Sequence, residues 1–286
     1  MLSPLRLVIG LLLAAFPAAA EVRTGVEFAK VEGHSLRLDL HRPDGDARPP
    51  LVVYVHGGAW RSGSRENAPI RGLVKHGFAV ASVDYRLSTQ AIFPAQIHDI
   101  KAAIRFLRIQ ADEFQIDADR IAIAGSSAGG HLAALVGVTN GNVELEGVVG
   151  DHAEQSSRID AIVSFYGASN LESILSQSTG IGLEVRVPAL QLLLGALPDK
   201  VPKLARLASP VAHLDTGDPP LMLIHGASDP QMPPAQSEEF REACEAAHIP
   251  VQLIMLPGSK HGGDEFYDEG RLHVVAEFLR EHLQQP

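Results

Sequence analysis

Ser127 lies in a segment that is typical of an activated serine nucleophile. The residues Gly125-Ser126-Ser127-Ala128-Gly129 match the pattern G-x-S-x-G and directly follow an apolar run at 121–124. In a sharp turn between a strand and a helix, this pattern exposes the serine hydroxyl above the sheet, and its glycines avoid clashes with the neighbouring strand and helix. We therefore predict that Ser127 is the nucleophile. Ser126 occupies a variable position of the pattern and is not expected to attack.

A serine hydroxyl needs a base that takes its proton and an acid that orients this base. In open parallel sheets, the reacting groups gather beyond the carboxyl ends of the strands. His261 follows the apolar run 251–256 in a glycine-rich loop, and Asp229 follows the apolar run 221–224. The order serine, aspartate, histidine along the chain is that of the α/β-hydrolases. We predict that Ser127, Asp229 and His261 form a catalytic triad.

An oxyanion forms when the serine attacks a carbonyl group, and it needs preorganised N–H donors. The apolar run 51–55 is followed by His56-Gly57-Gly58-Ala59-Trp60, whose small residues let backbone N–H groups approach a substrate. The residue after the nucleophile supplies a further donor. The N–H groups predicted to form the oxyanion hole are those of Gly57, Gly58, Ala59 and Ala128.

Three side chains beside these segments are expected to support the site. His56 is expected to hold its loop by hydrogen bonds and not to transfer protons. Trp60 is the only tryptophan, and two roles are open for it: it lines the acyl or alcohol side of the pocket, or it packs the loop. Tyr166, which follows the apolar run 161–165, is a second candidate for the wall of the substrate pocket.

The sequence gives no sign of a metal or cofactor. Residues 125–130 lack the Lys-Ser/Thr ending of a phosphate-binding loop, and no spacing of cysteines and histidines is typical of a zinc site. Cys244 is the only cysteine, so no intramolecular disulfide can form. It lies in a helix-like run and is expected to be buried. We expect no cofactor and no metal.

The elements that must position these residues alternate along the chain. Continuous apolar runs fit strands that are buried on both faces of a parallel sheet, and amphipathic stretches between them fit covering helices. Residues 26–31 and 36–41 predict an antiparallel hairpin at one edge. The predicted fold is therefore the α/β-hydrolase fold, a mostly parallel sheet with helices on both faces. The predicted strands are 51–55, 78–83, 121–124, 161–165, 221–224 and 251–256, and the clearest helices are 95–114 and 272–283.

Two segments interrupt this alternation. Residues 168–218 are predicted to be a small insertion over the edge of the sheet, with a helix at 185–197, and residues 141–158 are predicted to be a loop. Neither is large enough for a lid domain. We expect a minimal cap or none, and a single catalytic domain over residues 21–286.

Residues 1–20 have the order of a secretory signal peptide: Arg6, an apolar run at 7–16, and small residues up to Ala20. The run is too short to cross a bilayer, which takes about 20 residues. We expect cleavage near Ala20 and a mature protein that is secreted or periplasmic. The alternatives are an uncleaved anchor and a buried first helix.

Loss of Arg6 changes the net charge from −10 to −11. A negative protein is not expected to bind nucleic acids or anionic membranes. The oligomeric state stays open.

Six segments, in their order along the chain, resemble the bifunctional feruloyl and acetyl xylan esterase family, which is close to the hormone-sensitive-lipase-like carboxylesterases. They are HGGAW (56–60), DYRL (84–87), FPA (93–95) with Asp99, GSSAGGH (125–131), HGASDPQMP (225–233) and PGSKHGG (257–263). The resemblance covers about residues 26–283. It implies a serine carboxylesterase with little or no cap domain and no cofactor. It also implies the triad Ser127, Asp229 and His261.

The chain departs from the family pattern at two places. Ala59 stands where many hormone-sensitive-lipase-like enzymes have a third glycine, and Ala168-Ser169-Asn170 follow Phe165-Tyr166-Gly167. The second departure bears on the rim of the pocket, and so on the substrate more than on the chemistry.

These observations together predict a secreted serine carboxylesterase that acts through an acyl-enzyme intermediate. Its expected substrates are short-chain or aryl carboxylic esters, either small molecules or acetyl and feruloyl esters of plant polysaccharide. Two alternatives are open: a serine peptidase of the same fold, and a catalytically silent binding protein of that fold.

Overall fold

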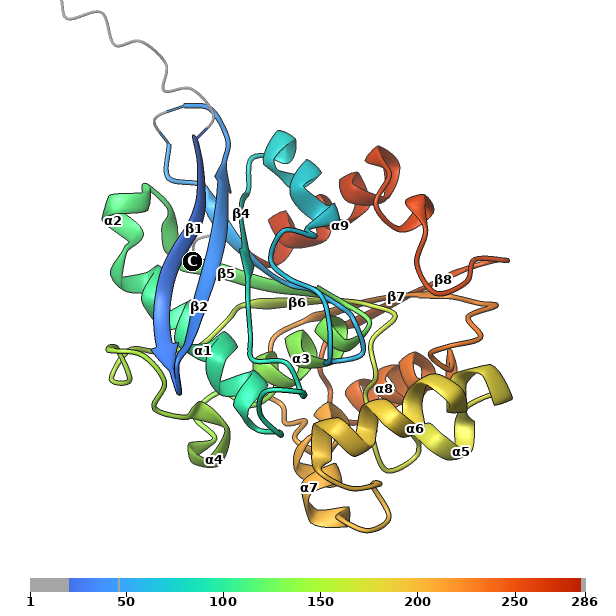
Figure 1. The fold of residues 1–286 in the computed structure, drawn as a ribbon. Coiled ribbons are helices and arrows are strands. Elements are labelled where there is room, and N and C mark those ends of the chain that lie inside the picture. Colours follow the sequence, from blue (N-terminus) through green and yellow to red (C-terminus); the bar gives the residue numbers. More distant parts are fainter. Residues whose placement is uncertain (1–20, 46, 284–286) are drawn as a thin grey trace, which may run out of the picture.

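The computed structural model describes residues 21–45 and 47–283 (Figure 1). The predicted signal peptide, residues 1–20, lies outside the described residues. Strands that neighbour one another in the sheet follow the order β1-β2-β4-β3-β5-β6-β7-β8. Their bounds are β1 (Glu21–Val31), β2 (His34–Arg42), β3 (Pro50–Val55), β4 (Ala79–Val83), β5 (Asp117–Ser126), β6 (Ala161–Phe165), β7 (Leu221–Gly226) and β8 (Val251–Leu256).

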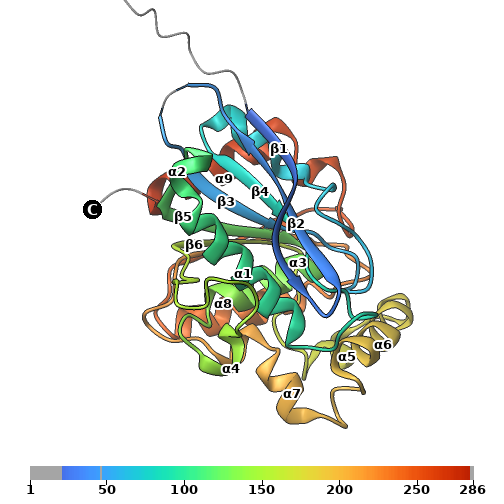
Figure 2. The same cartoon turned by 60° about the vertical axis from the view of Figure 1, so that its left-hand side comes forward.

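The predicted hairpin at the sheet edge is confirmed. β1 and β2 pair in antiparallel fashion, and β2 in turn pairs with β4 in the same sense. Every other neighbouring pair of strands is parallel. The hairpin lies beside the first long helix, α1 (Ala95–Ile109), as Figure 2 shows. The carboxyl ends of the six parallel strands therefore meet at one side of the sheet, where the predicted site residues follow them.

Helices cover both faces of the sheet, as predicted (Figure 1). Along β3, Leu51 and Val53 pack into one apolar core with α1, α3 (Ala128–Gly137) and α8 (Ala235–Ala246). The alternate residues Val52 and Tyr54 pack into a second core with the 3-10 helix η1 (Pro69–His76) and with α9 (Glu269–His282). Successive side chains of a strand point to opposite faces, so both sets must be apolar.

The expected helix over residues 95–114 is wrong in one respect. α1 ends at Ile109, and a separate turn, α2 (Ala111–Phe114), follows it. Gln115 then has a left-handed backbone with φ of 50°. The chain has to reverse here, because Asp117 begins β5 and its N–H donates to the carbonyl of Pro49 beside β3. The spacing of apolar residues stays helix-like through this reversal, so the sequence pattern does not indicate where α1 ends.

The segment 168–218 is helical and packs against the body of the sheet domain. It contains α5 (Ile174–Gln177), α6 (Gly180–Leu194), α7 (Pro202–Leu207) and η2 (Pro210–Ala212). The predicted helix at 185–197 is therefore displaced: α6 begins after Thr179, whose hydroxyl accepts the N–H of Gly182, and ends at Leu194, before Gly195 with its φ of 76°. The segment does more than cover an edge, since α6 reaches the carboxyl ends of the strands. The predicted loop 141–158 contains one short helix, α4 (Val143–Glu146).

The remaining element is η3 (Asp264–Phe266), between β8 and α9. Cys244 is buried in α8, as predicted, and burial raises the pKa of its thiol to about 12. Among the described residues, no helix combines the length and the apolar character that crossing a membrane requires.

Candidate active site

Ser127 stands in a sharp turn between β5 and α3. Its backbone has a φ of 54° and a ψ of −117°, a conformation that is strained for a residue with a Cβ atom. The glycines around it are required by space: a Cβ atom on Gly125 would lie 2.2 Å from the carbonyl oxygen of Gly129. A Cβ atom on Gly129 would lie 2.0 Å from the carbonyl oxygen of Val55. The turn therefore presents the serine hydroxyl beyond the end of the strand.

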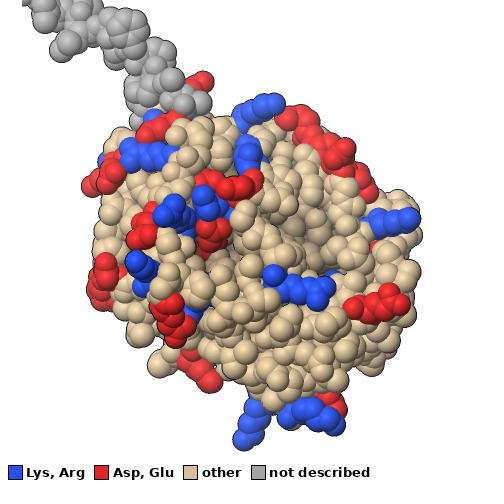
Figure 3. All heavy atoms as spheres, viewed as in Figure 1, with Lys and Arg blue, Asp and Glu red and all other residues tan. Residues whose placement is uncertain are grey.

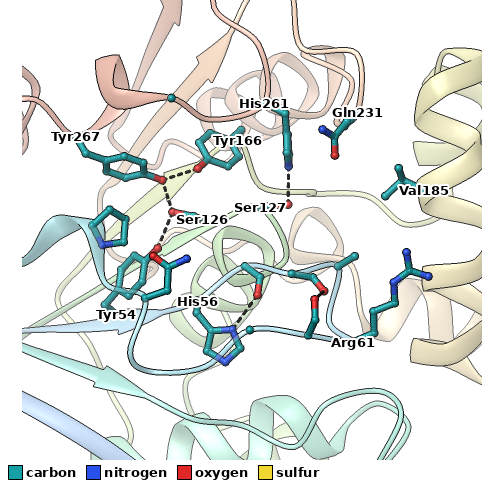
Figure 4. Close-up of a pocket in the computed structure, with 18 of the residues that line it drawn as sticks. Tyr54, His56, Arg61, Ser126, Ser127, Tyr166, Val185, Gln231, His261 and Tyr267 are labelled. Atoms are coloured by element: carbon teal, nitrogen blue, oxygen red, sulfur yellow. Dashed lines mark hydrogen bonds between the residues drawn. The ribbon is translucent and has the colours of Figure 1, made fainter. Parts of the chain in front are cut away.

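The structure brings the three predicted triad residues together. His261, in the loop after β8, has its Nε2 atom 2.8 Å from Ser127 Oγ (Figure 4). Its Nδ1 atom is 2.7 Å from Oδ2 of Asp229, in the loop after β7. The carboxylate accepts the Nδ1–H, which leaves the lone pair of Nε2 facing the serine hydroxyl. This is the tautomer that can take the serine proton.

Asp229 is buried and held in place by three hydrogen bonds and by a neighbouring histidine. Oδ1 accepts the backbone N–H groups of Gln231, at 2.8 Å, and Met232, at 2.9 Å. Oδ2 accepts the Nδ1–H of His261, and the buried His225 has its Nε2 atom 3.4 Å from the same oxygen and 3.1 Å from the carbonyl of Met232. Burial by itself would raise the pKa of Asp229, but the hydrogen bonds from His225 and His261 outweigh it and hold the pKa well below its usual range. The acid is therefore ionised throughout the neutral range.

His225 was not identified from the sequence. It is the fifth residue of β7, and its Nδ1 atom is 2.7 Å from the hydroxyl of Ser237. A signal was present, since His225 is a polar residue in an otherwise apolar strand and comes four residues before the candidate acid. Periodicity alone assigns such a residue to the core.

The predicted oxyanion loop follows β3 and lines the same pocket as Ser127. The Gly57 carbonyl is 2.8 Å from His56 Nδ1, and the Gly58 carbonyl accepts the N–H groups of Arg61 and Ser62. In a trans peptide, the N–H points opposite to the carbonyl, so the N–H groups of Gly58 and Ala59 point away from these partners. Among the described residues, no acceptor is found for either N–H. These two groups are suited to an oxyanion.

The other two predicted donors lie close by. A Cβ atom on Gly57 would be 2.8 Å from the carbonyl oxygen of Ser126, so only glycine allows the loop to approach the nucleophile this closely. Ala128 is the first residue of α3, and the first N–H groups of a helix have no partner within it. The part that these four N–H groups play in catalysis stays a prediction.

His56 holds the loop, as expected. Its ring stacks on Tyr85 with centroids 4.4 Å apart, and the Tyr85 hydroxyl donates to the carbonyl of His56. Burial lowers the pKa of the His56 imidazole. The next residue along, Arg86, pairs with the buried Asp99 through two nitrogens at 2.9 Å. The segment 84–87 and Asp99, which are two of the motifs that resemble the esterase family, therefore position the oxyanion loop.

Trp60 does not line the pocket, which settles its two open roles in favour of packing. Its side chain is fully buried, and its Nε1–H donates to His131 Nδ1 at 3.1 Å. The other nitrogen of that imidazole lies 2.6 Å from the carbonyl of Ala208. Burial lowers the pKa of His131 to about 4, so this ring is neutral and can accept from the indole.

Tyr166 does line the pocket, and it belongs to a chain of hydroxyl groups. Its hydroxyl is 2.5 Å from that of Tyr267, and the Tyr54 hydroxyl donates to Ser126 Oγ at 2.9 Å. Ser126 Oγ and Tyr267 Oη are also 2.5 Å apart, which joins the two pairs. Burial raises the pKa of each of the three tyrosines, so their hydroxyls are neutral. We call Tyr54, Ser126, Tyr166 and Tyr267 the hydroxyl wall.

The pocket over Ser127 has a volume of about 650 Å³. The hydroxyl wall stands on one side of Ser127 and His261, and Arg61, Val185 and Gln231 stand on the other (Figure 4). Val185 and Arg186 come from α6, so the segment 168–218 supplies part of the pocket. Among the described residues, no group of histidines, cysteines and carboxylates is arranged to hold a metal ion.

This sheet order, with the nucleophile after β5, the acid after β7 and the histidine after β8, is that of the α/β-hydrolase fold. The model of the BD-FAE family matches residues 38–244. The chain belongs to this family, which confirms the resemblance of its motifs.

Individual relatives are esterases by name. Esterase LipC of Mycobacterium tuberculosis is 33% identical over 85% of this chain and 62% of its own length. The structure of a truncated carbohydrate esterase from gut microbiota is 30% identical and has a TM-score of 0.85, covering 94% of this chain and 98% of that one. A thermophilic esterase from Thermogutta terrifontis, solved with propionate bound, is 27% identical with a TM-score of 0.73, over 94% and 97% of the two chains. The chain spans about three fifths of the length of the curated relatives that it matches.

Proposed function

We propose that the protein is a serine carboxylesterase that hydrolyses short-chain or aryl carboxylic esters through an acyl-enzyme intermediate. The hydrogen-bonded series from Asp229 through His261 to Ser127 is the observation that carries the proposal. Ser127 Oγ attacks the ester carbonyl while His261 Nε2 takes its proton, and the N–H groups of the oxyanion loop stabilise the negative oxygen. His261 then protonates the leaving alcohol, and the same steps with water release the acid.

Turnover of 4-nitrophenyl acetate tests this proposal directly. An esterase hydrolyses it at a rate that depends on Ser127, whereas a silent binding protein of this fold leaves the ester intact. The names of the relatives support the esterase reading, and the propionate bound to the Thermogutta terrifontis esterase is a short carboxylate.

Short acyl chains are expected to be the best substrates. A buried methylene contributes about 0.8 kcal/mol only where apolar surface meets it, and this pocket is lined by hydroxyl groups, arginines and backbone. We expect kcat/KM to be highest for acetyl to butanoyl esters and to fall beyond roughly eight carbons. A series of 4-nitrophenyl esters measures this dependence. Faster hydrolysis of the palmitate than of the acetate would contradict the open, polar pocket and would point to an acyl channel beside α6.

Acetyl or feruloyl esters of plant polysaccharide are the substrates that the family and the pocket favour. A sugar presents several hydroxyl groups, and the hydroxyl wall offers neutral donors and acceptors that match them. The gut carbohydrate esterase supports the same class. Acetylated xylan and methyl ferulate are therefore expected to be hydrolysed faster than a triolein emulsion, as release of acetate, ferulate or oleate would show.

Export of the protein is part of the proposal. The pattern of residues 1–20 supports cleavage near Ala20 and a secreted or periplasmic mature protein. Sequencing the amino terminus of protein recovered from periplasm or medium measures the cleavage site. Recovery of the activity only in the cytoplasm, with residues 1–20 intact, would contradict it.

A further inference from the structure

Arg186 brings a buried guanidinium to the active-site pocket without a counter-ion. The residue lines the pocket, yet its relative exposure is only 1%. The hydrogen bond found for it among the described residues runs from Nε to the carbonyl of Gln231, at 3.3 Å, and Nη1 has no partner there. Its carbon Cζ lies 5.9 Å from the centroid of the Trp60 ring, so the guanidinium makes a cation–π contact with the buried indole.

This lack of a counter-ion is exceptional in the described part of the protein. Buried charges are ordinarily paired, because an isolated ion loses its hydration without compensation. The other buried basic side chains follow the rule, as the closest carboxylate contacts show. These are Arg42 with Glu21 at 4.0 Å, Arg86 with Asp99 at 2.9 Å, Lys101 with Glu146 at 2.7 Å and Arg105 with Glu146 at 3.3 Å.

The carboxylate whose charge acts on Arg186 is Asp229, and that group already binds His261. Burial lowers the pKa of Arg186 to about 10, so the guanidinium still carries its charge at neutral pH. A buried positive charge therefore faces the pocket while the protein's own carboxylate is engaged in the triad.

Arg61 adds a second positive charge on the same side of the pocket. It follows the oxyanion loop, its side chain is exposed, and no ion pair is found for it among the described residues. Figure 4 shows it beside Val185, on the side opposite the hydroxyl wall. Figure 3 shows basic side chains at the margin of a hollow on this face. Two neighbouring cations repel each other, and an anion between them would relieve the repulsion.

From these contacts we propose that Arg61 and Arg186 form a binding site for a carboxylate of the substrate. Among the short-chain and aryl esters of the proposed function, the preferred ones bear a carboxylate on the half that lies toward α6, away from the hydroxyl wall. A guanidinium donates two parallel hydrogen bonds to a carboxylate, which suits this task. Asp264, the one carboxylate among the lining residues, begins η3, three residues before Tyr267 of the hydroxyl wall. The inference rests on the proposed esterase function and names the charge of its substrates.

Two matched pairs of esters test the proposal and show which half carries the charge. For the acyl half, the 4-nitrophenyl monoester of glutarate is compared with that of glutaramate, its neutral amide. For the alcohol half, 4-acetoxybenzoate is compared with 4-acetoxybenzamide. We expect kcat/KM of the wild-type enzyme to favour the anionic member of one pair by about tenfold or more, as charge-assisted hydrogen bonds in a partly buried site allow. Added salt is expected to reduce this preference.

The ratio of anionic to neutral kcat/KM is then measured in variants. Arg61→Gln, at an exposed position where folding is not at risk, and Arg186→Met are both expected to lower the ratio by about tenfold. Lys203→Gln removes an exposed charge from α7, outside the pocket, and should leave the ratio unchanged. No preference in either pair, or a ratio that neither arginine variant changes, would overturn the proposal. An equal loss on both members would assign Arg186 to the support of Asp229 instead.

Failure of the esterase proposal gives a different result. If the wild-type protein hydrolyses none of the four esters, the carboxylate site can still be tested by binding. Titration calorimetry then measures the affinity for 5-amino-5-oxopentanoate, an anion, and for neutral glutaramide. Binding of the anion alone, weakened by Arg61→Gln, would support the site. Equal binding of both compounds, or none, would overturn it.

Discussion

Ser127→Ala is expected to lower kcat by roughly 10⁴- to 10⁶-fold, because only substrate binding and the oxyanion hole remain when the attacking group is lost. The variant should fold, since the Oγ atom of Ser127 contacts His261 at the surface of the pocket and the strained turn keeps its glycines. Hydrolysis of 4-nitrophenyl acetate measures the loss. A residual rate within tenfold of the wild type would show that another group attacks the ester.

Ser126→Ala is the matched control, because it removes the neighbouring hydroxyl from the same turn. Ser126 Oγ is hydrogen-bonded to Tyr54 and Tyr267 and not to His261, so no base can take its proton. We expect the activity to stay within roughly tenfold of the wild type. An organophosphonate should label Ser127 in the wild-type protein, and a label on Ser126 would contradict the assignment of the nucleophile.

Asp229→Asn is expected to lower kcat by roughly 10⁴-fold, the size that the same change has in a serine protease triad. The amide would present N–H donors to His261 or His225 in place of a carboxylate oxygen. The imidazole would then carry its proton on Nε2 and could not accept that of Ser127 Oγ. The loss should fall on kcat more than on KM, since Asp229 is not among the residues that line the pocket.

The pH dependence separates the roles of the acid and the base. The pKa of Asp229 is held well below its usual range, so this carboxylate stays ionised as the pH falls through the mildly acidic range. Asp229 therefore cannot cause a loss of kcat/KM in that range, and a general base that has already bound a proton cannot accept that of Ser127. A near-wild-type Asp229→Asn enzyme with an unchanged pH profile would show that a different acid orients the imidazole.

The chemistry of this site could be predicted from the sequence because its signals are local. The pattern around Ser127 needs only a strand before it and a helix after it, and both are readable from apolar spacing. Asp229 and His261 are 32 residues apart, yet one rule brings them together: the carboxyl ends of parallel strands meet at one side of the sheet. The alternation of strands and helices thus determined the fold class and the predicted triad without any knowledge of packing.

Tyr166 was predicted to line the pocket, but the rest of the pocket wall was decided by the tertiary structure. Tyr54, Tyr166 and Tyr267 come from three distant parts of the chain, and no sequence motif that contains one of them predicts its contact with the others. Arg186 lies in a helix whose spacing is mostly apolar, and its role depends on what α6 faces and on the lack of a carboxylate beside it. Trp60 is a residue type that often lines pockets, but here it is fully buried and its ring packs against the guanidinium of Arg186. The periodicity of apolar residues in the sequence indicates which side chains become buried. The direction in which a buried polar side chain points depends on contacts between distant segments, which only the folded chain brings together.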